Sequence, residues 1–149
     1  MSEARSDTLV EMKIASDPRL LNIVRCAIER LSQMLGFSQQ EARMITLAVD
    51  EACANVICHT YEKRSDCEIT IQCRRLPDGL EIVLQDGGPK VEEGLLKPRP
   101  LDEVKPGGLG LHFMYSIMDR VMYDSEYQDG NRLIMIKKFK PAPTREPSA

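Results

Sequence analysis

Apolar residues near the start of the chain follow first a strand pattern and then a helix pattern. "TLVEMKIAS", residues 8–16, alternates apolar and polar side chains and predicts a first strand. Asp17 and Pro18 provide an N-cap and a first helical residue, and the helix that they begin is predicted to end at Gly36. Its apolar face, which we expect to pack on a core, consists of Leu20, Leu21, Val24, Ala27, Ile28, Leu31 and Leu35.

A second helix is predicted to follow directly. Ser38 and Glu41 match a capping box, in which each side chain binds the backbone N–H of the other residue, and the helix then continues to about Tyr61. Its later half carries three polar residues spaced four positions apart on an otherwise apolar surface: Glu51, Asn55 and His59. Because positions i and i+4 lie nearly above one another in an α-helix, this polar stripe is either a solvated face or a site.

Two β-rich runs in the middle of the chain predict a hairpin. "CEITIQCRRL", residues 67–76, and "LEIVLQD", residues 80–86, are separated by the turn-forming residues "PDG". Such a short connection favours antiparallel pairing. Asp86 is then the last residue of the second strand.

A long connection separates this hairpin from the C-terminal elements. Residues 87–108 contain five glycines and four prolines, and we expect them to form a mobile lid. Helical spacing returns in residues 109–120, and the runs 121–127 and 132–139 predict a last hairpin around the residues "QDG". The tail, residues 141–149, is predicted to be disordered.

The predicted order of elements is therefore β, α, α, β, β, lid, α, β, β. Hairpins and few strand–helix–strand crossovers favour an α+β fold, a two-layer sandwich in which three helices cover one face of a mixed, mostly antiparallel sheet. With 149 residues, of which 42% are hydrophobic, the chain can bury one core. We expect one domain over residues 9–140, between an extension at residues 1–8 and the tail.

Charge and composition exclude several classes of protein. The net charge of −3 argues against the broad basic surface that binding to nucleic acid or to an anionic membrane requires. The N-terminus lacks a hydrophobic signal segment, so we expect a cytoplasmic protein. The cysteines are odd in number and form no CxxC pair, which predicts reduced, buried thiols at Cys26, Cys53, Cys58, Cys67 and Cys73.

Three features of the chain could carry chemistry on a nucleotide. In the stripe, Asn55 could supply an oxygen ligand to Mg²⁺ and Glu51 could accept a proton. Asp86 could accept a hydrogen bond from an exocyclic amine such as that of adenine. The glycines of "GGLGL", Gly107, Gly108 and Gly110, could bind phosphate at a helix N-terminus or could form only a tight entry turn.

The common alternative motifs are absent from the sequence. No GxxxxGK[ST] P-loop occurs, and "GLGLHF" follows a proline-rich loop and has Phe113 where GxGxxG requires a small residue. No HExxH zinc motif occurs, and the chain has only two histidines, His59 and His112.

Together, "LAVDEACANVICHTY", "LQDGGP" and "GGLGL" resemble the N, G1 and G2 boxes of the GHKL ATPase superfamily. The resemblance is closest to the anti-sigma factor serine/threonine protein kinases that pair with STAS-domain anti-anti-sigma factors. It implies an ATP-dependent kinase that uses Mg²⁺, binds a sigma factor, phosphorylates a STAS-type antagonist and forms a homodimer.

The resemblance also assigns a role to each matching residue. It implies that Glu51 is the general base, Asn55 the Mg²⁺ ligand, Asp86 the adenine anchor and Gly88 the residue that shapes the turn below adenine. The backbone that it implies closes over the phosphates belongs to Gly107, Gly108, Leu109, Gly110 and Leu111. His59 has two open interpretations: it lies in the nucleotide site, or its imidazole interacts with the last carbonyls of the helix.

The sequence departs from the family pattern at two places. Pro89 and Lys90 follow Gly88, so the second glycine of the DxGxG pattern is missing, and Arg132 stands where a threonine is common. A helical segment with a phospho-accepting histidine, typical of a sensor histidine kinase, is not found.

Two other functions remain open at this stage. The first is a binding module of the same fold that acts by sequestration without catalysis. The second is a small-molecule hydrolase that uses Glu51, His59 and Asp86, although no nucleophile or set of metal ligands accompanies them.

Overall fold

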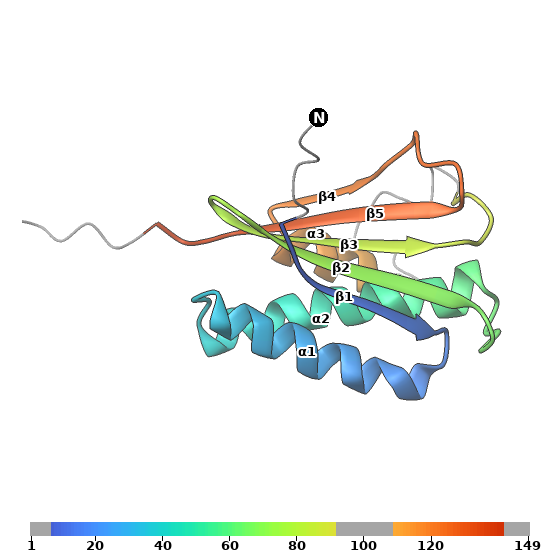
Figure 1. Ribbon diagram of the computed structural model, residues 1–149, viewed down its shortest axis with the longest axis horizontal. Coiled ribbons are helices and arrows are strands. Elements are labelled where there is room, and N and C mark those ends of the chain that lie inside the picture. Colours follow the sequence, from blue (N-terminus) through green and yellow to red (C-terminus); the bar gives the residue numbers. More distant parts are fainter. Residues whose placement is uncertain (1–6, 92–108, 142–149) are drawn as a thin grey trace, which may run out of the picture.

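The computed structural model describes residues 7–91 and 109–141, and its central feature is a five-stranded sheet (Figure 1). The strands are β1 (Thr8–Ala15), β2 (Glu68–Leu76), β3 (Gly79–Asp86), β4 (Arg120–Tyr123) and β5 (Asn131–Lys138). Their order in the sheet is β1-β2-β3-β5-β4, and every neighbouring pair is antiparallel. The described part of the sheet is thus wholly antiparallel, where the sequence allowed a mixed sheet.

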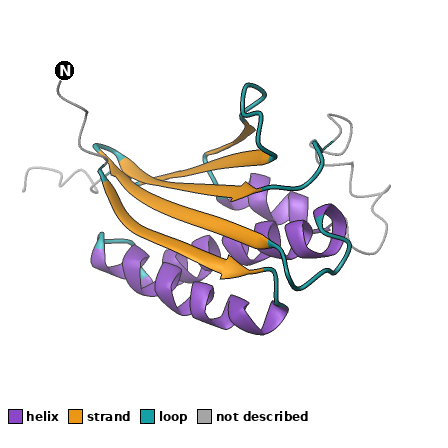
Figure 2. Cartoon of the chain, turned by 45° about the vertical axis from the view of Figure 1, so that its right-hand side comes forward, coloured by secondary structure: helices purple, strands orange, loops and turns teal. Residues whose placement is uncertain are grey.

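The helices lie together on one side of this sheet (Figure 2). They are α1 (Leu21–Met34), α2 (Gln39–Asn55) and α3 (Leu109–Ile117), with a 3-10 turn at Pro18–Leu20 before α1 and a π-helix at Val56–Thr60 after α2. The second helix packs against both of the others. The predicted α+β two-layer sandwich is therefore confirmed.

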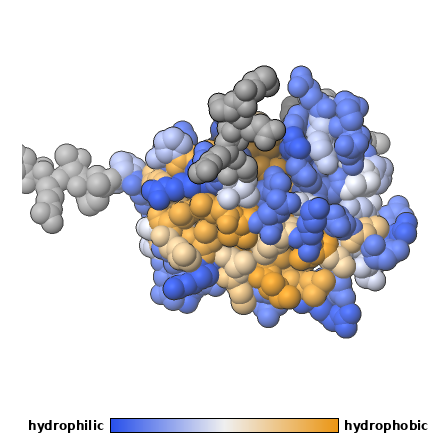
Figure 3. Space-filling view, viewed as in Figure 1, coloured by the Kyte–Doolittle hydropathy of each residue, from blue (hydrophilic) through white to orange (hydrophobic). Residues whose placement is uncertain are grey.

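Alternation along the strands separates the two faces of the sheet. Ile71 on β2 pairs with Met12 on β1 and with Leu84 on β3, and this face packs against the helices to form the core. The opposite face carries polar residues such as Lys13 and Gln72. Hydrophobic areas also reach the surface beside hydrophilic ones (Figure 3). Among the described residues, the exposed large apolar ones are Leu9, Ile23, Met34, Met44 and Phe113.

Two element boundaries near the C-terminus differ from the sequence prediction. Helix α3 ends at Ile117, before the predicted Arg120, because the backbone N–H of Asp119 already donates to Ile136 of β5 at 2.8 Å. Strand β4 ends at Tyr123 because Asp124 starts a turn: its side chain accepts from the N–H of Glu126 at 3.0 Å. A short polar side chain of this kind competes with the strand ladder for backbone groups.

The second predicted helix is continuous only to Asn55. From Val56 to Thr60 the chain forms a π-helix, and the N–H of Tyr61 donates to Val56 at 2.8 Å, five residues back. The prediction of one α-helix to about Tyr61 is wrong for these five residues. Single π-turns of this kind are frequent at functional sites.

The cysteines differ in exposure, contrary to the prediction that all are buried. All five are free thiols: Cys53 and Cys73 are buried, Cys67 is half-buried, and Cys26 and Cys58 are exposed. Burial raises the pKa of both the Cys53 and the Cys73 thiol to about 12. Cys26 and Cys58 lie on the solvent sides of helices whose other faces carry the apolar pattern.

Several predictions lie outside the described residues. They are residues 142–149 of the tail, most of the N-terminal extension, the lid from residue 92 onward, and the two glycines Gly107 and Gly108. In the part of the chain that the structure describes, no helix is long and apolar enough to cross a membrane.

Candidate functional site

The polar stripe lies at the C-terminal end of α2. The capping box at the other end of this helix is formed as predicted, since Ser38 Oγ accepts from the N–H of Glu41 at 3.1 Å and Glu41 Oε1 accepts from the N–H of Ser38 at 3.2 Å. Glu51 and Asn55 are half-buried at the rim of the helix layer. His59 is exposed and belongs to the π-helix.

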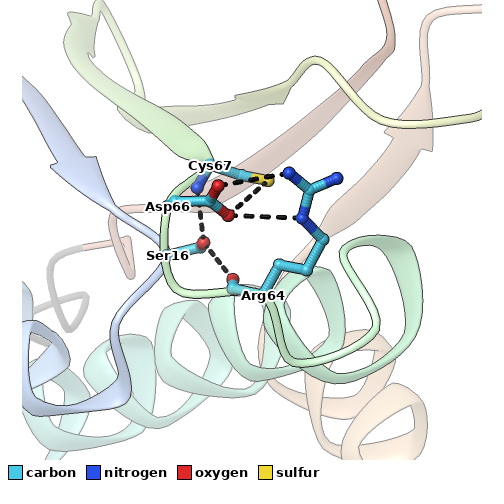
Figure 4. Close-up of polar contacts among 4 residues, drawn as sticks. All are labelled: Ser16, Arg64, Asp66 and Cys67. Carbon is cyan, nitrogen blue, oxygen red and sulfur yellow. Dashed lines mark hydrogen bonds and ion pairs between the residues drawn. The ribbon is translucent and has the colours of Figure 1, made fainter.

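The loop that follows the π-helix returns the chain to the sheet. Ser16, at the end of β1, is fully buried and holds this loop: its Oγ donates to the carbonyl of Arg64 and accepts from the N–H of Cys67 at 3.1 Å (Figure 4). Arg64 also pairs with Asp66 at 3.1 Å. The end of the helix layer is thereby fixed to the first strand of the sheet.

Tyr61 connects the end of the helix layer to the end of β3. Its ring is buried, and its hydroxyl donates to the carbonyl of Glu68 at 2.6 Å. The same hydroxyl accepts from the N–H of Gly87 at 2.8 Å. Tyr61 therefore holds the residue that follows Asp86 against the start of β2.

Asp86 is a buried carboxylate at the end of β3 and lies on the face of the sheet that the helices cover. Its Oδ1 accepts from the N–H of Gly88 at 2.9 Å and from Asn131 Nδ2 at 3.0 Å. Burial raises the pKa of Asp86, while these hydrogen bonds and the charge of Lys90 act to lower it. Tyr123 is also affected, since burial and the Asp86 charge raise its pKa to about 12.

The turn at Gly88 packs directly on the end of the helix layer. A Cβ at Gly88 would lie 2.4 Å from Thr60 Cγ2 and 3.3 Å from Tyr61 Cε1, so the turn takes this path only with glycine. The structure thus brings Asp86 and Gly88 to the end of the helix layer that carries Asn55 and Glu51. The two predicted parts of the site, separate in sequence, lie at one end of the fold.

The third predicted part of the site is described only at its end. Leu109, Gly110 and Leu111 form the first turn of α3, and α3 packs against α2. The phosphate role predicted for this helix N-terminus stays a prediction.

One buried polar residue beside Asp86 was not predicted from the sequence. Asn131, the first residue of β5, is 4% exposed and contacts Asp86, whereas Arg132 pairs with Asp124 at 3.4 Å and stacks over the Tyr127 ring at 4.4 Å. The side chain that contacts the adenine-anchor candidate is thus that of Asn131. Its signal in the sequence is an asparagine, a poor strand former, at the start of an apolar strand.

Comparison with known proteins decides the family. Residues 14–137 match the sequence model of the histidine kinase-like ATPase domain. The chain belongs to the histidine kinase-like ATPase family. The family that the motifs indicated is therefore confirmed.

Relatives of this ATPase domain include bacterial serine-protein kinases. The chain is 32% identical over 123 residues to the serine-protein kinase RsbW of Bacillus pumilus, covering 76% of each protein. It is 29% identical over 120 residues to RsbW of Bacillus subtilis, covering 75% of each. Its fold is similar to the crystal structure of the SiaB–SiaC complex from Pseudomonas aeruginosa, with a TM-score of 0.67, 13% identity, and coverage of 89% and 90%.

The described residues of this ATPase domain fit an adenine nucleotide. Asp86 offers a buried acceptor, and Gly88, which has no side chain, packs closely against Thr60 and Tyr61 beside it. Within residues 7–91 and 109–141, no three His, Cys, Asp or Glu side chains are grouped to hold a metal ion. Asn55 offers a neutral amide oxygen, which is a ligand type that suits Mg²⁺ bound together with a nucleotide.

A groove of about 520 Å³ lies on the other face of this domain. Strand residues that point away from the helices, among them Lys13, Thr70 and Gln85, line it. It reaches Asp86 and Gly87 at one end, but neither Glu51 nor Asn55 lines it. This groove is thus distinct from the stripe.

Proposed function

We propose that this ATPase domain is a cytoplasmic, ATP-dependent serine/threonine protein kinase that acts as an anti-sigma factor. It binds a sigma factor and phosphorylates a STAS-type antagonist, and it acts as a homodimer. The observation that carries the proposal is the buried Asp86 carboxylate, held beside the Gly88 turn at the end of the helix layer that bears Glu51 and Asn55. The relatives named serine-protein kinase RsbW support the choice of reaction.

Asp86 and Gly88 would select the base. Adenine carries an exocyclic amine that donates to a carboxylate, whereas guanine presents a carbonyl at the same edge position. Asp86 Oδ1 already accepts two hydrogen bonds, and these hold the plane of the carboxylate. Gly88 lets the chain turn closely below the base.

Glu51 and Asn55 would serve the phosphate end. Mg²⁺, when bound with ATP, supplies charge neutralisation to the phosphates, and Asn55 would hold it. Glu51, one turn earlier, would accept the proton of the serine or threonine hydroxyl of the antagonist. His59 lies beyond Asn55 at the exposed end, and the backbone of residues 107–111 would close over the phosphates.

Three substitutions test this division of roles. Glu51→Ala should leave the affinity for MgATP nearly unchanged and lower phosphate transfer by about 10²-fold or more. Asn55→Ala should lower both affinity and transfer, and Asp86→Asn should abolish ATP binding without unfolding the domain. The measurements are nucleotide titration and transfer of labelled phosphate to a STAS-type protein captured with the chain.

A matched control and the contrary outcomes complete this test. Glu126→Ala removes an exposed carboxylate in the β4–β5 connection and should change neither quantity. Transfer at the wild-type rate by Glu51→Ala would show that the base lies elsewhere. A chain that binds its partners but never transfers phosphate would instead be a module that acts by sequestration.

A further inference from the structure

The loop that follows β3 is held by side chains. Among the described residues, the backbone of residues 87–91 makes no hydrogen bond to another backbone group. The N–H of Gly87 donates to Tyr61, and the N–H of Gly88 donates to Asp86. The remaining two bonds, from the N–H of Val91 and to the carbonyl of Pro89, both involve Asn131.

Asn131 uses its whole amide group in these contacts. Its Nδ2 donates to Asp86 Oδ1 at 3.0 Å and to the Pro89 carbonyl at 2.9 Å, and its Oδ1 accepts from the N–H of Val91 at 2.9 Å. The residue is 4% exposed. Since an amide has two donor hydrogens and one acceptor oxygen, each of these groups has a partner.

The preceding residue places Asn131 against Asp86. Gly130 has φ +137°, and a Cβ there would lie 1.9 Å from the Asp86 carbonyl oxygen, so that the two strand ends approach this closely only with glycine. Asp86 and Asn131 are then direct partners in the sheet register. The close approach of the two strand ends therefore sets the contact between Asn131 and Asp86.

We propose that Asn131 is a positioning residue for nucleotide binding: it orients the Asp86 carboxylate toward the adenine amine and holds the loop of residues 87–91 as the floor of the base site. This inference rests on the proposed function, in which Asp86 binds adenine. Both donors, Gly88 N–H and Asn131 Nδ2, reach Oδ1, so that Oδ2 takes neither of these two bonds. In this proposal Oδ2 is the oxygen that accepts from the adenine amine. In this role Asn131 acts through Asp86 and the loop.

This role of Asn131 has an electrostatic consequence. The titratable groups near Asp86 come from three elements: Lys90 from its own loop, Tyr61 from the end of the helix layer and Tyr123 from β4. Burial raises the pKa of Asp86 and the Asn131 hydrogen bond lowers it. Removing Asn131 should therefore raise that pKa further, and the loss of ATP binding on acidification should occur at higher pH.

The test measures MgATP affinity as a function of pH for the full chain. Asn131→Ala and Asn131→Asp both remove the donors to Asp86 and Pro89, and each should weaken binding at neutral pH by about tenfold or more. In both variants, the pH below which MgATP affinity is lost should be higher than in the wild type. The control Asn22→Ala removes an exposed asparagine of α1. It should change neither the affinity at neutral pH nor the pH at which affinity is lost.

Two comparisons keep this inference separable from the proposed function. In the first comparison, Asp86→Asn loses ATP binding, but a folded Asn131→Ala binds ATP with the affinity and the pH dependence of the wild type. This result would overturn the role of Asn131 and leave the proposed function standing. If Asp86→Asn binds ATP normally, both are overturned. If the Asn131 variants fail to fold, NMR of the side-chain amide of Asn131 in the wild type gives the answer. Slow hydrogen exchange of this amide, and a change of its signals at the pH where Asp86 titrates, would support the role. Hydrogen exchange as fast as that of the Asn22 amide would overturn it.

Discussion

At the scale of single residues, the buried carboxylate of Asp86 should make the stability of the domain depend on pH. Its folded-state pKa is raised above the ordinary value of 3.8 by burial, so the folded state binds the proton more tightly than the unfolded state. The contribution of Asp86 to the free energy of unfolding is therefore largest below that ordinary value. It falls as the pH rises through the folded-state pKa and stays low above it.

Asp86→Asn should remove this pH dependence and keep the hydrogen bonds. The new amide oxygen can still accept from Gly88 and Asn131, while the buried charge is gone. The free energy of unfolding of the variant, relative to the wild type, should therefore increase between about pH 4 and pH 7. Urea denaturation at both pH values measures this difference in the free energy of unfolding. The control is Asp78→Asn, which changes an exposed carboxylate in the turn between β2 and β3. A constant difference would contradict the raised pKa.

The positions of the candidate site residues were predictable where the signal is local. Glu51 and Asn55 lie within α2, as helical spacing predicted, and their roles stay a prediction. Asn131 was not predictable, because its partners Asp86, Pro89 and Val91 lie more than 39 positions away and contact it only through the sheet register. A single asparagine beside a turn glycine looks the same whether or not it has such partners.

At the scale of elements, two glycines with positive φ offer a direct comparison. Gly130 has φ +137° and lies against Asp86, whereas Gly36, after α1, has φ +105° and nothing within 4 Å of a Cβ. Gly36→Ala should therefore cost about 1–2 kcal/mol of backbone strain and leave nucleotide affinity unchanged.

Gly130→Ala should lower both stability and nucleotide affinity more than the control Gly36→Ala does. The added Cβ must displace the Asp86 backbone, so the variant should lose roughly 3 kcal/mol or more of stability and bind MgATP poorly. Thermal denaturation and nucleotide titration of both variants measure these effects. Equal stability and affinity of the two variants would show that β5 does not need its close approach to Asp86.

The elements themselves were predicted well where one pattern dominates. The capping box set the start of α2, and the "PDG" turn set the hairpin of β2 and β3. Errors occurred where another interaction competes with the pattern: the Asp124 side chain ends β4 early, and a π-helix replaces the last turn of the second helix. The π-helix brings Thr60 and Tyr61 against Gly88, a tertiary contact that helical periodicity does not contain.

At the scale of the whole molecule, the two-layer architecture follows from the order of elements. The turn-linked hairpins make adjacent antiparallel strands, and the paired helices α1 and α2 return the chain so that β2 lies beside β1. The site is formed where distant segments end together, at Tyr61, Asp86 and Asn131. Their meeting depends on the sheet order, which places β5 between β3 and β4.

Because the site connects these segments, ATP should stabilise the whole domain. A ligand at about 100 times its dissociation constant adds roughly 2.7 kcal/mol to the free energy of unfolding, which for a chain of this size raises Tm by about 5–10 °C. MgATP and MgADP should both produce a shift, since both carry the adenine that Asp86 would bind. MgGTP should produce little, because guanine lacks the amine at that position.

Thermal denaturation of Asp86→Asn with the same nucleotides shows whether the shift in Tm depends on the Asp86 carboxylate. This variant keeps the hydrogen bonds to Oδ1 but loses the ionised acceptor, so its Tm should not respond to MgATP, whereas the exposed control Glu126→Ala should respond like the wild type. No shift of the wild type with either adenine nucleotide would remove the ATP-dependent function and leave a protein-binding module. An equal shift with MgGTP would mean that Asp86 does not select the base, and the nucleotide would then be held by its phosphates alone.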